Sequence, residues 1–89
     1  MDTEGTTLTA VIELIGTTLG IEARAATFGA GTALFGELPE LDSLGVVQLA
    51  TALEGRFGFQ IEDEEFTAEV FESVGSLADF VSAKVNQSR

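Results

Sequence analysis

Three stretches of the chain place apolar residues at helical spacing, and this pattern constrains the fold most. They run from about residue 7 to 19, 43 to 57 and 76 to 85. Apolar residues recur there every three or four positions, as on one face of an amphipathic helix, and no stretch shows strand alternation. The stripes are Leu8, Val11, Ile12, Ile15 and Leu19; Val46, Leu49, Ala50, Leu53 and Phe57; and Leu77, Ala78, Val81 and Val85, widened by Phe80. An all-α fold is therefore predicted.

Residues with known capping preferences flank these stretches. Gly20 and Gly58 follow the first and second stretches, where a glycine commonly ends a helix. Asp42 precedes the second stretch and is a good N-cap. Ser76 and Asp79 form a candidate capping box for the last helix.

The connection between the first two helices, residues 21–41, is long for a small domain. Its glycines and Pro39 break regular structure, yet it also carries apolar side chains, which predict an ordered loop held to the core. They are Phe28, Leu34, Phe35, Leu38 and Leu41. We explain the length by two helices that run nearly parallel, because the chain must then travel back before the second helix begins.

A short fourth helix is predicted at residues 67–71, with Val70 and Phe71 pointing inward. The expected architecture is a four-helix bundle of three main helices and one short one. With 89 residues, the chain is one domain over 1–89, with an ordered core at about 6–85.

Composition excludes several classes of function. The chain has no Cys and no His, which excludes a Cys nucleophile, a Ser–His relay and a Cys/His zinc site. We therefore expect no enzyme and no catalytic residue. Four basic residues against 15 acidic ones give a net charge of −11, which disfavours nucleic acid and anionic membranes and favours partners with basic patches. The N-terminus has no signal-peptide pattern and no stretch is apolar enough to span a membrane, so we expect a cytoplasmic protein. We also expect a monomer.

The acidic run Glu62 to Glu65 is a weak candidate for a cation site. It lacks the alternating ligands and the central glycine of a calcium-binding loop. We interpret it as a solvated helix start and predict no metal site.

The segment Leu41-Asp42-Ser43-Leu44 lies where the long loop meets the second helix. A serine at a helix start is exposed, and the unpaired N–H groups and partial positive charge there would stabilise a phosphate ester on its hydroxyl. Taken alone, the segment is ordinary capping chemistry.

Its context resembles the acyl carrier protein family, in which an Asp-Ser-Leu triplet opens the second helix of a four-helix bundle. The run from Leu41 to Glu54 is similar to that helix, and residues 71–77 with Phe80-Val81 resemble the entry to the last helix. The resemblance covers about residues 6 to 85.

The resemblance implies that a phosphopantetheinyl transferase attaches 4'-phosphopantetheine from coenzyme A to Ser43, with Asp42 orienting the incoming group. The imported thiol would carry an acyl group as a thioester and present it to acyl-loading and acyl-processing enzymes. Leu44, Val47 and Thr51 lie off the core stripe, with Glu54 nearby. The family's use of these positions implies a partner-binding surface there, with Glu54 and Asp42 as its charged contacts.

The sequence also departs from the family. Fatty-acid carriers have acidic residues where Gly45, Gln48 and Gly55 stand, so we expect a dedicated pathway, of polyketide, fatty-acid-like or related type. The residues before Ser43 favour acyl cargo over peptidyl cargo. An aminoacyl, peptidyl or D-alanyl carrier stays open, as does an unmodified helical adaptor.

Overall fold

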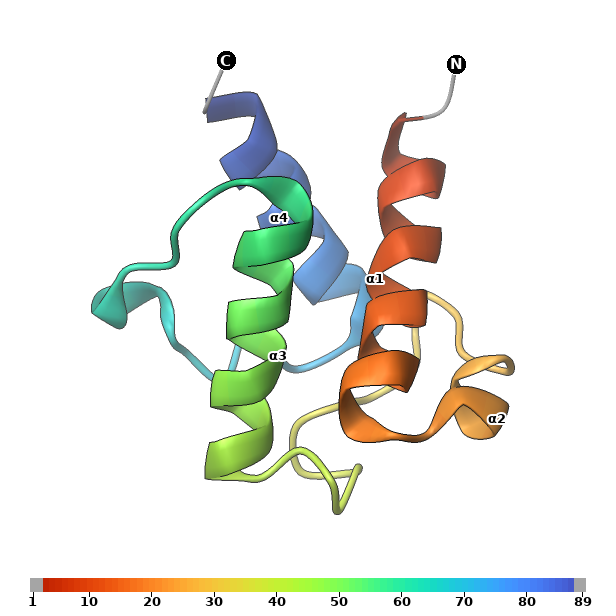
Figure 1. The fold of residues 1–89 in the computed structure, drawn as a ribbon. Coiled ribbons are helices and arrows are strands. Elements are labelled where there is room, and N and C mark those ends of the chain that lie inside the picture. The colour runs from red at the N-terminus through yellow and green to blue at the C-terminus, as the bar shows by residue number, and fades with distance from the viewer. Residues whose placement is uncertain (1–2, 88–89) are drawn as a thin grey trace.

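The computed structural model describes residues 3–87 as a bundle of helices (Figure 1). The elements are α1 (Thr3–Leu19), α2 (Glu22–Ala25), α3 (Ser43–Phe57), the 3-10 helix η1 (Asp63–Glu65) and α4 (Val74–Gln87). Within that range the only β-type pairing is one isolated bridge between Ala33 and Ser73. The predicted all-α bundle with three main helices is confirmed. The connection after the first is long, as predicted, but it is not all loop, because it contains α2.

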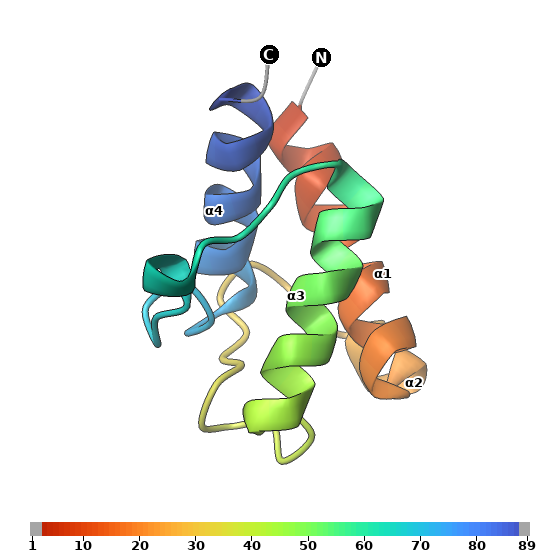
Figure 2. The same cartoon turned by 60° about the vertical axis from the view of Figure 1, so that its left-hand side comes forward.

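Helix α1 is the centre of the bundle, because it packs against α2, α3 and α4. Both views show α3 and α4 running in the direction opposite to α1 (Figures 1 and 2). The expectation that the first two main helices run nearly parallel was therefore wrong, and the length of the loop between them has another cause.

The predicted apolar stripes form the core. The members that α1, α3 and α4 bury completely are Val11, Ile15, Leu49, Leu53, Leu77 and Val81. Stripe residues nearer the edges, such as Leu8, Val46 and Val85, are partly buried and pack against that cluster. No helix within residues 3–87 combines the length and apolarity that crossing a membrane requires.

The connection before α3 makes a detour to pair with the chain before α4. The N–H of Leu34 donates to the carbonyl of Glu72 at 2.8 Å, and the N–H of Val74 donates to the carbonyl of Thr32 at 3.0 Å. Leu34 is fully buried, so the loop also fills part of the core. This pairing explains why the connection is long and ordered.

The short helix predicted at residues 67–71 was misplaced. Residues 68–71 form turns, and the helical turn lies earlier, at Asp63–Glu65. The acidic run caps itself, because the N–H of Glu62 donates to Oε1 of Glu65 at 2.8 Å. The helical turn thus lies on polar residues that cap one another. The prediction that Phe71 faces inward is confirmed.

Helix α4 starts two residues before the predicted cap. The N–H of Ser76 donates to Oγ of Ser73 at 3.1 Å, and the N–H of Ser73 donates to Oγ of Ser76 at 3.0 Å. The reciprocal capping pair is therefore Ser73 and Ser76 rather than Ser76 and Asp79.

An ion pair fastens η1 to α4. Nζ of Lys84 lies 2.9 Å from Oε1 of Glu65. The hydrogen bond from the Glu62 backbone, together with Lys84, holds the pKa of Glu65 below its usual range. A carboxyl with a lowered folded-state pKa stabilises the fold above its unfolded pKa, and that contribution is lost as pH falls through the folded value.

We therefore expect Glu65→Gln to flatten the loss of stability on acidification. Denaturant unfolding between about pH 6 and pH 3 measures this slope. The matched control is Glu64→Gln at an exposed neighbouring position, which should keep the parent's slope. Equal slopes for parent and Glu65→Gln would contradict this role of Glu65.

Candidate functional site

Ser43 is the first residue of α3 and is exposed, as the sequence predicts. Leu41, two residues earlier, is buried and anchors the end of the loop in the core. Oδ1 of Asp42 accepts the N–H of Gly45 at 2.8 Å, so Asp42 is the N-cap of α3. An anchored residue and a cap therefore hold the Ser43 hydroxyl at the surface.

A close backbone approach fixes the same turn. Gly45 is buried, and a Cβ at this position would collide with the carbonyl oxygen of Glu40. The side chain of Glu40 is held as well, because both its oxygens accept from the Arg24 guanidinium, at 2.8 and 3.1 Å. Position 45 is thus not part of the exposed surface. The charge comparison with fatty-acid carriers treated Gly45 as a surface position, and that part of the comparison was wrong.

The start of α3 suits a phosphate group. Asp42 already accepts the N–H groups of Gly45 and Val46, through its side chain and its carbonyl respectively. The N–H groups of Ser43 and Leu44 have no acceptor within the part of the chain that the structure describes. They lie at the positive end of the helix, so the residues fit a phosphodiester on Ser43.

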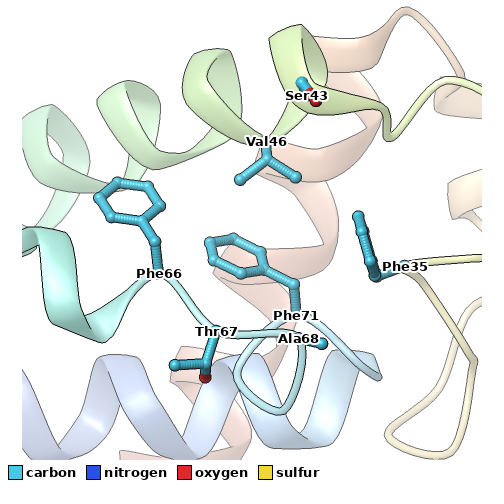
Figure 3. A pocket seen from close by; sticks show the side chains of 7 residues that line it. All are labelled: Phe35, Ser43, Val46, Phe66, Thr67, Ala68 and Phe71. Carbon is cyan, nitrogen blue, oxygen red and sulfur yellow. The ribbon is translucent and has the colours of Figure 1, made fainter.

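An apolar hollow of about 280 Å³ opens beside Ser43. Figure 3 shows Val46 reaching from α3 toward the rings of Phe66 and Phe71, with Phe35 at the other end. The full lining is Phe35, Ser43, Val46, Phe66, Thr67, Ala68 and Phe71. No charged side chain lines the hollow, so it suits an apolar group.

Three segments distant in sequence form these walls. The N–H of Phe35 donates to the carbonyl of Phe71 at 2.9 Å, and the rings of Phe66 and Phe71 stack with centroids 6.2 Å apart. Phe35 and Ser43 also border a shallower, more open hollow over the loop at 36–42. Ser43 therefore lies at the junction of two surface hollows.

The residues predicted to bind partners share one face of α3. Leu44 and Val47 are 64% and 55% exposed. The hydroxyl of Thr51 donates to the carbonyl of Val47 at 3.0 Å. Oε2 of Glu54 accepts the N–H of Ile61 at 2.7 Å, which ties the chain after α3 to the helix. Each of the two polar members of the face therefore makes one hydrogen bond to the protein backbone.

Sequence reasoning missed the hollow. Phe35 was assigned to the core with the other apolar loop residues, yet it is 48% exposed. Phe66 was not singled out, and it is also exposed at 38%. Phe66 lies far from Ser43 in the sequence, so its position beside the serine depends on tertiary pairing. Within residues 3–87, no cluster of three His, Cys, Asp or Glu side chains could hold a metal ion.

Comparison with known proteins supports the family resemblance that the sequence shows. A family model described as the phosphopantetheine attachment site matches residues 9–81. An acyl carrier protein from Thermosynechococcus vestitus is 45% identical over 53 residues, which are 60% of this chain and 63% of that relative. The chain thus spans less than two thirds of the length of that relative.

Among solved structures, the solution NMR structure of a holo acyl carrier protein from Nitrosomonas europaea is similar. It superposes with a TM-score of 0.83 at 44% identity, covering 89% of this chain and 95% of that one. The helical bundle and the exposed serine at the start of α3 agree with the class of phosphopantetheine-bearing carrier proteins that the family model describes. The chain belongs to the acyl carrier protein family, whose members carry a covalently bound 4'-phosphopantetheine.

The two glycines of α3 give a test of the turn that presents Ser43. Gly45→Ala should lower the free energy of unfolding by at least about 1 kcal/mol, because the new Cβ displaces the Glu40 carbonyl. Gly55→Ala meets no atom within 4 Å and should stabilise the helix by roughly 0.5–1 kcal/mol. Denaturant unfolding of both variants checks the opposite signs, and two stabilising substitutions would contradict the close approach at Gly45.

Proposed function

We propose that Ser43 is the attachment residue for 4'-phosphopantetheine and that the chain carries acyl groups as thioesters on this arm. The observation that carries the proposal is the exposed hydroxyl of Ser43 at the capped start of α3, beside an apolar hollow. The arm supplies the thiol that a chain without cysteine lacks. Asp42 acts by holding the helix start, since its carboxylate caps Gly45.

The hollow supports acyl cargo over the aminoacyl alternative. An aminoacyl thioester carries an ammonium group, which needs a carboxylate partner or water when it leaves bulk solvent. The hollow beside Ser43 has phenyl and aliphatic walls and no carboxylate. We infer an apolar acyl intermediate of a dedicated biosynthetic pathway, of polyketide or fatty-acid-like type.

The partners under this proposal are a phosphopantetheinyl transferase and the enzymes that load and process the acyl group. Leu44, Val47 and Thr51 form their contact surface, with Glu54 on the same face. The net charge of −11 favours enzymes with basic surfaces. We also propose a monomer that acts in the cytoplasm, since self-repulsion at a net charge of −11 disfavours self-association.

Modification of Ser43 tests the attachment site. After incubation with coenzyme A, Mg²⁺ and a promiscuous phosphopantetheinyl transferase, intact-protein mass should rise by one phosphopantetheine. Ser43→Ala should show no gain while keeping its helicity, because the cap residue is Asp42. The matched control is Ser82→Ala in α4, which should be modified like the parent. A mass gain on Ser43→Ala would place the attachment on another residue and contradict Ser43 as the site. No gain on the parent, with an active control carrier, would support the unmodified adaptor instead.

Thioester lifetime tests the cargo. The quantity compared is the hydrolysis rate of the hexanoyl thioester divided by that of the acetyl thioester. This ratio should be at least about twofold lower on the holo-protein than on free pantetheine, because the hollow shields the hexanoyl thioester from water. Val46→Ser, in the lining, should remove this protection, and Val47→Ser, its exposed neighbour outside the lining, should keep it. Mass spectrometry over time measures both, with unfolding curves as the control for folding. Equal ratios on protein and free pantetheine would contradict a cargo held in the hollow.

A further inference from the structure

A third surface hollow, of about 380 Å³, lies between α1 and α2. Within residues 3–87, α1 is the only helix against which α2 packs. In both views α2 lies on the side of α1 away from α3 (Figures 1 and 2). The lining of this hollow shares no residue with the two hollows that border Ser43. The surface is therefore separate from the attachment site.

A close contact between the two helices forms the floor of this hollow. Gly16 and Ala25, its two buried lining residues, face each other there. A Cβ at Gly16 would lie only 3.0 Å from Cβ of Ala25, so α2 rests directly on the glycine. Ile12, one turn earlier on α1, adds an aliphatic side chain to the lining. The floor therefore offers aliphatic carbon and no side-chain polar group.

Two carboxylates flank this apolar floor. Glu13 precedes Gly16 by three residues, so both lie on one face of α1. Glu22 begins α2, and its Cγ would lie 3.7 Å from a Cβ at Gly16. Both glutamates are exposed, and among the residues that the structure describes neither carboxylate has a hydrogen bond or an ion pair. The hollow thus combines an apolar floor with two negative charges that have no internal partner.

We propose that the hollow between α1 and α2 binds a lysine or arginine side chain from a basic segment of a partner protein. The aliphatic stem of that side chain lies on the floor, and its charged end lies between Glu13 and Glu22. Lysine and arginine have this amphipathic form, because they bury the stem while the charged end stays at the surface. The inference goes beyond the proposed function and does not rest on modification of Ser43.

Charge complementarity selects this occupant over the others. A purely apolar group would take water away from two carboxylates and give them no partner in return. A second copy of the chain, with a net charge of −11, would be repelled. A partner held in this hollow leaves Ser43 accessible, so it need not compete with the enzymes that act on the arm.

The experiment titrates the isotope-labelled protein with the peptide acetyl-Ala-Lys-Ala-amide and follows the amide NMR spectrum at constant ionic strength. Shifts should concentrate at residues 12–17 and 22–26. The control peptide carries an acetylated lysine, which keeps the stem and removes the charge. It should bind about tenfold more weakly, because both ion pairs are lost.

Two pairs of variants separate the hollow from general attraction to an acidic chain. Glu13→Gln and Glu22→Gln should each weaken peptide binding about threefold. Glu64→Gln and Glu69→Gln change the net charge by the same amount at exposed positions elsewhere, and they should leave the dissociation constant unchanged. Circular dichroism of all four variants checks that their helicity equals that of the parent.

A lysine built into the hollow gives an independent test. Ala26→Lys places an ammonium group in the lining and should abolish the peptide-induced shifts at residues 12–17. Ala23→Lys makes the same change of charge on α2 outside the lining and should keep them.

Three results would overturn the inference. Equal binding of the acetylated peptide would indicate an apolar occupant, and equal weakening by Glu64→Gln or Glu69→Gln would indicate attraction without a site. Shifts at residues 12–17 on concentrating the protein alone would indicate a second copy. None of these results affects the mass gain at Ser43, so the proposed function is tested separately.

Discussion

The capped, closely packed start of α3 is the constraint on which the site depends. Gly45 lies so near the Glu40 carbonyl that no side chain fits, and Asp42 caps the N–H of the same residue. Leu41 on one side and Leu49 on the other are buried. Ser43 thus has little freedom to turn inward, and its hydroxyl is presented on a rigid element rather than on a mobile loop.

The hollow depends on a second constraint, the pairing of the loop before α3 with the segment before α4. Backbone hydrogen bonds at Leu34 and Phe35 bring one aromatic wall beside Phe71. The ion pair of Glu65 with Lys84 fastens the segment that carries Phe66. In this small bundle with a thin core, the segments that connect the helices therefore form the binding surface, and a deep internal cavity does not.

Local signals predicted the helices well and the connections poorly. Periodicity predicted α3 with its bounds, since the Asp42 cap, the apolar stripe and the terminal Gly58, with a φ of 75°, all agree. The 3-10 turn was misplaced because a reciprocal contact of Glu62 with Glu65 outweighed the apolar pattern at residues 67–71.

For the candidate site too, local signals were sufficient for some residues and not for others. Ser43 and Asp42 could be selected from the sequence through the family resemblance, and their positions at a helix start depend only on neighbouring residues. The hollow could not, since Phe35, Val46 and Phe66 meet only through tertiary pairing. The internal use of Glu54 was equally hidden, because its acceptor role depends on how the chain returns after α3.

The central claim is that Ser43 tethers its cargo on a preformed surface that includes the hollow. Amide NMR spectra of the unmodified, holo and hexanoyl forms test this most directly. We predict that the shifts concentrate at Phe35, residues 43–47 and residues 66–71, with α1 and α4 unchanged. Shifts confined to Ser43 and its neighbours in the hexanoyl form, or spread through α1 and α4, would contradict it.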